Sequence, residues 1–410
     1  MEKMQQFNAG VILTRDEVKE LLDSGVKVSP MQWVETDKNA HKRRDGVKVE
    51  PELKSRLVGC GNFEEDMYNE LRTDSPAGDV DAHNLVLSWC ASNKVRLRSA
   101  DISSAYLQGR EVDRIILYRI PKGGIPEEGV EDGAIIAARV PIYGTRDAGR
   151  GFWLRLKEVV KSEGYDLNQI LPTVFMLRKD GRIVSVMSSN VDDLLYGSLP
   201  DEEHHMQKIL DTFNVREQNE GKFRFCGKEI TQNGDFSIDV NARDNTEKIR
   251  PIDIKAGRKL TDRCTPDEST ALRSVTASLA WIARQVRPDL SYRVSKLQTA
   301  AGKGFVKDLK ECNKVLDYAL STSDQGLHFT ADGIDWDNIV VCTITDASFC
   351  NETIYEDGQK LDGRSQQGFV LCIAPAGIAN MTEAPIHPIA WSSTVTVSYT
   401  HLTLPTILLV

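Results

Sequence analysis

Two adjacent aspartates, Asp192 and Asp193, are the residues of this chain whose type and spacing most directly suggest chemistry. They stand between two apolar runs, Ile183–Met187 and Leu194–Tyr196, which predicts a β-hairpin over residues 182–198 with both carboxylates at its tip. Like charges at that separation repel unless something neutralises them. A divalent cation is the usual neutraliser, and carboxylate oxygens suit Mg²⁺ or Mn²⁺. The alternative is an ordinary acidic turn, because aspartate is common in turns.

A third carboxylate, Asp101, precedes this pair by about ninety residues. It lies in a segment, Val95–Gly109, that the sequence predicts to be a strand, and residue parity places it on the face that carries Val95 and Leu97. A lone carboxylate there would be poorly solvated. A strand aspartate followed by a hairpin Asp-Asp pair is the arrangement of a polymerase palm. In such a site two metal ions, roughly 4 Å apart, clamp the attacking 3′ oxygen and the leaving pyrophosphate.

Three segments carry a resemblance to a known family. DISSAYLQG (101–109), IYGTRDAGRGFW (142–153) and NVDDLLYGS (190–198) occur in the order and spacing found in the reverse transcriptase of copia-type LTR retrotransposon Pol polyproteins. The similarity continues upstream through residues 33–61 and downstream through FRFCGKEI (223–230) and residues 279–298. It covers most of the chain between Trp33 and Ser393, and six matching pieces in one order are hard to obtain by chance.

The resemblance implies an α+β fold in which a polymerase palm, fingers and thumb precede a partial ribonuclease H-like α/β sheet. On this basis we expect five parts. They are a lead-in segment (1–32), the reverse transcriptase fingers and palm (33–230), a thumb or connection (231–330), a truncated ribonuclease H-like domain (331–394) and an aberrant tail (395–410).

The resemblance also assigns roles to the three carboxylates. Asp101, Asp192 and Asp193 would be both catalytic residues and metal ligands, holding two Mg²⁺ (or Mn²⁺) ions. The reaction would be the template-directed addition of deoxynucleotides to a primer 3′ end. The implied partners are an RNA template, a DNA primer or RNA–DNA hybrid, and dNTPs.

Further residues would bind the nucleotide. Lys54 and Arg56 lie two apart on a predicted strand, so they share a face and would steady the triphosphate. Tyr106 stands where the family has an aromatic residue that excludes a 2′-hydroxyl by its bulk. The plainer alternatives are a charged strand edge for the two basic residues and a core aromatic for Tyr106.

Two positions depart from the family pattern. Asp147 replaces a glutamine that contacts the incoming nucleotide in relatives, and it would add negative charge beside the triphosphate. Asn190 replaces a tyrosine before the Asp-Asp pair. Both changes favour an alternative function, a decayed and catalytically inactive retroelement product that at most binds nucleic acid. A metal-dependent phosphohydrolase using the same carboxylates is a third possibility, for which no basic or histidine motif is present.

The end of the chain resembles the start of a ribonuclease H domain. Asp346 would be the first metal carboxylate, near the end of a strand that begins at Ile339. The acidic helix expected after Trp391 is missing, because the sequence from Ser398 onward has no acid and contains Pro405. We therefore expect no ribonuclease H activity, and the sequence from about Val395 is interpreted as read-through or out-of-frame.

Composition sets broader limits. The 410 residues carry a net charge of −9, which is unusual for a nucleic-acid binder. However, residues 139–161 contain six Lys/Arg against two acids, and a local basic stretch can still bind phosphates. Eight single cysteines indicate reduced thiols, and no apolar run is long enough to cross a membrane. We expect a cytoplasmic location in virus-like particles, with the nucleus as a second compartment, and interpret His204 and His205 as surface residues.

Overall fold

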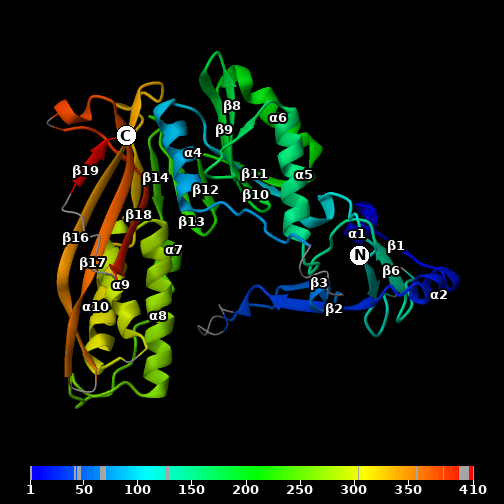
Figure 1. Cartoon of the computed structure of the whole chain (residues 1–410), viewed down its shortest axis with the longest axis horizontal. Coiled ribbons are helices and arrows are strands. Elements are labelled where there is room, and N and C mark those ends of the chain that lie inside the picture. Colours follow the sequence, from blue (N-terminus) through cyan, green and yellow to red (C-terminus); the bar gives the residue numbers. More distant parts are fainter. Residues whose placement is uncertain are drawn as a thin grey trace.

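The computed structural model describes residues 2–40, 43, 48–64, 71–125, 129–302, 304–356, 359–381, 383–396 and 406–409. Within these residues the chain forms four β-sheets with helices packed between and around them (Figure 1). The α+β prediction is confirmed. None of the described helices is both long enough and apolar enough to span a bilayer.

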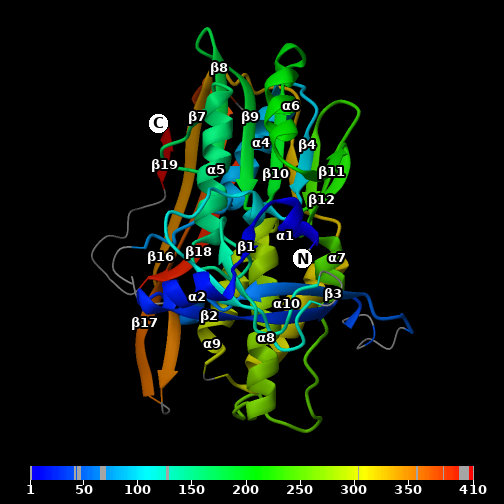
Figure 2. The same cartoon turned by 90° about the vertical axis from the view of Figure 1, so that its right-hand side faces the viewer.

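The first sheet has five strands in the order β1-β6-β5-β2-β3. Its strands are β1 (Gly10–Ile12), β2 (Val28–Asp37), β3 (Leu53–Gly59), β5 (Leu117–Arg119) and β6 (Ile135–Ala138). Two helices, α1 (Glu2–Gln6) and α2 (Arg15–Asp23), lie beside it (Figure 2). Thr14 and Glu17 form a capping box at the start of α2. Residues 10–12, within the expected lead-in, pair with residues 136–138 and so belong to this sheet.

The second sheet carries the aspartate hairpin and has the order β11-β4-β10-β9-β8-β7. Its strands are β4 (Arg98–Ile102), β7 (Asp166–Leu167), β8 (Val174–Lys179), β9 (Arg182–Asn190), β10 (Asp193–Ser198) and β11 (Val215–Glu220). The expected strand Val95–Gly109 is shorter than predicted. Ser104 adopts a left-handed backbone with φ +53°, and a 3₁₀ turn, Ala105–Gln108, follows.

Helices cover both faces of this second sheet. On one side α5 (Ala148–Ser162) and α6 (Glu203–Thr212) bury Leu194 and Tyr196 of the hairpin. On the other side α4 (Val80–Ser92) packs against Leu97 and Leu195. Ten of the thirteen residues of α4 are buried, so the helix has no exposed polar face. The reason is that the C-terminal sheet covers the side of α4 that the second sheet leaves free, and a helix covered all round has no polar face.

A third sheet and a helical bundle follow. The sheet order is β12-β13-β14-β15, with β12 (Lys222–Phe225), β13 (Lys228–Gln232), β14 (Ile238–Asn241) and β15 (Leu327–Phe329). The helices are α7 (Arg243–Glu247), α8 (Pro266–Gln285), α9 (Ser291–Ala300) and α10 (Val306–Ser321). Pro288 starts a 3₁₀ turn that separates α8 from α9.

The C-terminal sheet is antiparallel in the order β18-β17-β16-β19. Its strands are β16 (Ile339–Glu356), β17 (Gln359–Pro375), β18 (His387–Thr396) and β19 (Thr406–Leu409). Strand β18 docks on the rest of the molecule: the Trp391 indole N–H donates to the Ala283 carbonyl of α8, and the Asn84 amide of α4 donates to Ile389 O. Part of the apolar tail, β19, pairs with residues 342–345 of β16.

Candidate active site

The tip of the β9–β10 hairpin is a two-residue loop, Val191–Asp192. Val191 has φ +57°, a backbone conformation that β-branched residues rarely adopt and that tight hairpins usually give to glycine. Such strain persists only where the surroundings over-determine the backbone. One restraint is a hydrogen bond of 2.9 Å from the Ile102 N–H to the Asp192 carbonyl, which ties the loop to the neighbouring strand β4.

The strand register brings two of the three predicted carboxylates together. Asp193 on β10 stands directly opposite Asp101 on β4, although they are far apart in sequence. Directly opposed residues share one face of an antiparallel sheet, with Cβ atoms about 4.5–5.5 Å apart. Asp101 and Asp193 are half-buried, and Asp192 is exposed at the tip. The two half-buried aspartates form a like-charge pair, and like charges directly opposite each other destabilise a sheet.

The electrostatics of the hairpin reflect this crowding. Burial, then Asp192, then Asp101, raise the pKa of Asp193 to about 6. The side chain of Asp192 is exposed, yet the protein around the loop still desolvates it and raises its pKa, with Asp101 contributing and Lys54 and Arg56 opposing. Asp101, Asp192 and Asp193 offer carboxylate oxygens, the ligands that suit Mg²⁺ or Mn²⁺. Among the described residues, the ligand atoms of these three side chains are not all within 4.8 Å of one another.

The predicted basic pair lies on this side of the molecule. Lys54 and Arg56, both half-buried on β3 of the first sheet, lower the pKa of Asp192 through their charge. Arg56 also acts on the pKa of Tyr143. Two cations of the first sheet are therefore near enough to the aspartate hairpin of the second sheet to act on its charge.

Two tyrosines complete this surface. The rings of Tyr106 and Tyr143 lie 5.3 Å apart between centroids. Burial raises the pKa of each phenol, and the charge of Asp192 raises both further. Tyr106 was singled out from the sequence, whereas Tyr143 was not, although it lies inside the matching segment 142–153. The local sequence does not distinguish Tyr143 from a core residue. Its ring contacts Tyr106, which is 37 positions away in the chain, and a local pattern does not show such a contact.

Asp147 has a partner that the sequence did not indicate. It lies just before α5, and its carboxylate forms a bidentate ion pair with Arg114, with distances of 2.5 and 2.8 Å. The same guanidinium reaches Glu64 at 3.2 Å, and the Tyr118 hydroxyl donates to that glutamate. Bidentate pairing of this kind is strong and directional. The carboxylate of Asp147 is thus paired within the protein with a guanidinium that it shares with Glu64.

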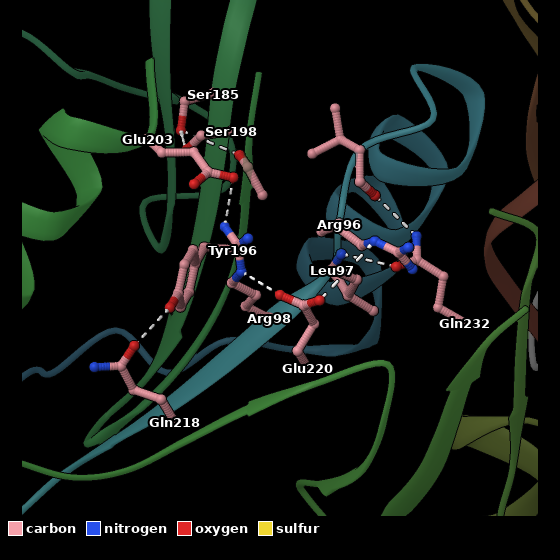
Figure 3. A network of polar contacts seen from close by, with 12 residues as sticks. Arg96, Leu97, Arg98, Ser185, Tyr196, Ser198, Glu203, Gln218, Glu220 and Gln232 are labelled. Carbon is pink, nitrogen blue, oxygen red and sulfur yellow. Dashed lines mark hydrogen bonds and ion pairs between the residues drawn. The ribbon is translucent and has the colours of Figure 1, made fainter. Parts of the chain in front are cut away.

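A polar network fixes the strand that bears Asp101 (Figure 3). Arg98 of β4 donates to Glu203 of α6 at 2.8 Å and to Glu220 of β11 at 2.6 Å. Next to it, the Leu97 N–H donates to the side chain of Gln232, which in turn donates to the Val95 carbonyl. Strand β4 is therefore tied to a helix, to an adjacent strand and to the third sheet, which holds Asp101 in register with Asp193.

The β12–β13 turn approaches the hairpin tip from the third sheet. The Asn190 side-chain amide donates to the Cys226 sulfur at 2.9 Å, and Asn190 stands directly opposite Asp193. The carboxylates of Asp193 and Asp192 raise the pKa of the Cys226 thiol, after the larger effect of burial. Asn190, which departs from the family pattern, therefore has a structural role of its own, because it contacts the β12–β13 turn.

Two other groups lie apart from this surface. In the described part of the chain, one set of three His, Cys, Asp or Glu side chains, Glu202, His204 and His205, has ligand atoms all within 4.8 Å of one another. Glu202 in that set is ion-paired with Lys179, and His204 is exposed, as expected for a surface residue. Asp346 is exposed on β16, opposite Gly368 of β17.

Comparisons with known proteins bear on this geometry. A family model described as reverse transcriptase (RNA-dependent DNA polymerase) matches residues 17–249. Two Arabidopsis thaliana proteins, the retrovirus-related Pol polyproteins from transposons RE1 and RE2, are each 24% identical to the chain over 360 residues. Those alignments cover 83% of this chain but 22% of each relative, so the chain spans about a fifth of their length.

One solved structure gives a similar alignment. The foamy viral protease–reverse transcriptase dRH in complex with double-stranded DNA aligns over 93% of this chain and 56% of that chain. The sequence identity is 15% and the TM-score is 0.45.

The raised pKa of Asp193 predicts a pH-dependent stability effect in the absence of metal. A carboxyl group whose folded-state pKa, about 6, exceeds its ordinary value near 3.8 loses protons at a cost as pH rises through that window. In EDTA, Asp193→Asn should therefore be more stable than the wild type at pH 8, by roughly 1–3 kcal/mol, and the gain should disappear near pH 4. Urea unfolding at both pH values measures it.

The matched control for that measurement is Asp180→Asn, at the exposed turn between β8 and β9. It should change stability little at either pH. A gain for Asp193→Asn that stays the same from pH 4 to pH 8 would show that charge repulsion at the hairpin is not its cause.

Proposed function

The chain belongs to the reverse transcriptase (RNA-dependent DNA polymerase) family, in its copia-type retrotransposon Pol group, and from this premise we propose that it is an active RNA-directed DNA polymerase. The observation that carries the proposal is the register that sets Asp193 opposite Asp101, beside Asp192. This arrangement gives three carboxylates at the end of a sheet, next to cationic and aromatic side chains from other elements.

Asp101, Asp192 and Asp193 would hold two Mg²⁺ or Mn²⁺ ions, whose bound charge would activate the primer 3′ oxygen and stabilise the leaving pyrophosphate. The protein's own contribution is positioning. The hydrogen bond from Ile102 to the hairpin loop and the Arg98 network keep the carboxylates at a fixed separation, so little reorganisation is needed during reaction.

The nucleotide would lie between the hairpin and the first sheet. Lys54 and Arg56 would contact the triphosphate, since both already act on Asp192 electrostatically. Tyr106, packed on Tyr143, would lie under the sugar and reject a 2′-hydroxyl by its bulk. In this proposal the Arg114 ion pair keeps Asp147 from repelling the triphosphate.

The partners in this proposal are an RNA template, a DNA primer and dNTPs. Family membership supports them, and so does the basic character of α5, which carries Arg150, Arg155, Lys157 and Lys161. A cytoplasmic location in virus-like particles, with the nucleus as a second site, belongs to the same proposal.

The competing function is that of an inactive retroelement product that binds nucleic acid without extending a primer. The net charge of −9 and the unusual residues at positions 147 and 190 favour it. Primer extension on a poly(rA) template with Mg²⁺ or Mn²⁺ separates the two functions directly.

Removing one carboxylate tests the metal site. Asp192→Asn should abolish extension because the ions lose a ligand, while folding and duplex binding stay near wild-type values. Extension is measured under single-turnover conditions, with Asp180→Asn as the control. A variant that keeps a tenth or more of the wild-type rate, a barrier change of about 1.4 kcal/mol or less, would place the chemistry elsewhere.

Shortening the proposed sugar gate tests Tyr106. Tyr106→Ala should admit ribonucleotides, so that the ratio of kcat/KM for deoxy- over ribonucleotides falls while extension persists. Tyr106→Phe keeps the bulk and should retain the wild-type ratio. An unchanged ratio in the alanine variant would make Tyr106 an ordinary packing residue.

We also propose that the chain lacks ribonuclease H activity. A two-metal hydrolytic site needs several converging carboxylates. Asp346 is exposed on β16, and Gly368, the residue directly opposite it on β17, has no side chain that could bind a metal ion. A labelled RNA–DNA hybrid incubated with Mn²⁺ should remain intact. RNA cleavage by the wild type that is lost in Asp346→Asn would contradict this expectation.

A further inference from the structure

A lysine is completely buried close to the proposed active site. Lys228, on β13, has no exposed surface. Lysines are almost never fully buried unless they are paired with an opposite charge. In the described part of the chain no carboxylate lies within ion-pair distance of this ammonium group. Its Nζ lies instead 3.1 Å from Nδ1 of His83, a buried residue of α4.

The protonation states of this pair follow from its environment. Burial lowers the pKa of Lys228 to about 8, and burial together with Lys228 holds the pKa of His83 well below its usual value. At neutral pH the lysine is therefore charged and the imidazole is neutral. The ammonium group donates to Nδ1, so the single ring proton of His83 is on Nε2.

The other side of His83 faces the catalytic hairpin. A Cβ atom built on Gly78 would lie 2.9 Å from His83 Nε2, 3.2 Å from the Ser188 hydroxyl and 2.7 Å from the Ser189 carbonyl, so these atoms surround one point. The Gly78 N–H already donates to the Ser189 carbonyl at 2.9 Å. Ser188 and Ser189 belong to β9 and directly precede Asn190. His83 thus sits where α4 meets the hairpin.

The same lysine also anchors a second contact to the hairpin. Lys228 directly follows the β12–β13 turn, whose residues Cys226 and Gly227 have φ +45° and +79°. This turn holds Asn190 through the Cys226 sulfur, and Asn190 is opposite Asp193. The Lys228–His83 contact therefore connects the β12–β13 turn, which contacts Asn190, with α4, which begins two residues after the Gly78 N–H that donates to Ser189.

We propose that Lys228 is a positioning residue: its contact with His83 fixes the β12–β13 turn and α4 against the β9–β10 hairpin, and thereby sets the position of Asp192 and Asp193. The proposal rests on the proposed polymerase function for its kinetic consequence only. A buried charge that replaces an apolar side chain usually lowers stability, and apolar replacements of buried charged groups are often neutral or stabilising. On this reasoning the buried charge of Lys228 serves to position the hairpin and does not add to stability.

The test compares Lys228→Met, which keeps the chain length but removes the charge, with Lys222→Met, an exposed lysine on the paired strand β12. Thermal stability, duplex affinity, kcat and the KM for dNTP are measured for each. Lys228→Met should be at least as stable as the wild type, with unchanged duplex affinity and KM but kcat reduced about tenfold or more, because the carboxylates are displaced. Lys222→Met should match the wild type throughout.

A second measurement does not depend on polymerase activity. Hydrogen exchange of the free protein in EDTA should become faster in peptides covering residues 183–196 of Lys228→Met, and stay unchanged in α5 and β8. Gly78→Ala, which forces a Cβ between α4 and the hairpin, should produce the same pattern from the other side. It replaces Lys228→Met if that variant does not fold.

Unchanged hydrogen exchange in the hairpin of Lys228→Met or, if it does not fold, of Gly78→Ala, would overturn the inference. So would a stable Lys228→Met with wild-type kcat. If the wild type itself does not extend primers, the proposed function fails while the exchange result still decides the role of Lys228.

Discussion

The repulsion between Asp101 and Asp193, set directly opposite each other on adjacent strands, is the constraint on which the rest of the structure depends. Two partly desolvated carboxylates in this register destabilise the sheet unless a cation lies between them. The surrounding elements must hold the strands in place against that repulsion. Carboxylate oxygens in such an arrangement are the ligands that hard divalent cations prefer.

The scaffold meets this demand by burying polar contacts rather than by adding apolar area alone. Helix α4 is enclosed by the second sheet, the third sheet and the C-terminal sheet, and it contacts the third and C-terminal sheets through polar side chains as well as through packing. Arg98 links β4 to α6 and β11. Each of these contacts is directional, so a one-residue slip of the register would leave buried donors without acceptors. The polar contacts therefore specify the register in which the strands pair.

Local features of the fold and of the site were predictable from the sequence, whereas contacts between residues far apart in the chain were not. The hairpin, the break at Pro288 and the cap at Thr14 follow from short patterns of apolar, turn and capping residues. By contrast, the Arg114–Asp147 pair joins residues 33 apart, and the Lys228–His83 pair joins residues 145 apart. No local pattern encodes which charge meets which, since that depends on how separate elements pack. The expected strand to Gly109 was too long because the left-handed backbone at Ser104 has no clear sequence signal.

The central claim is that Asp101 and Asp193 belong to one cation site. The most direct measurement is the thermal stabilisation produced by Mn²⁺ in the wild type, Asp101→Asn, Asp193→Asn and the double variant. If both residues bind the same ions, either single change should remove most of the stabilisation and the double variant should lose no more than the worse single variant. Stabilisation that persists in both single variants, or losses that simply add, would contradict a shared site.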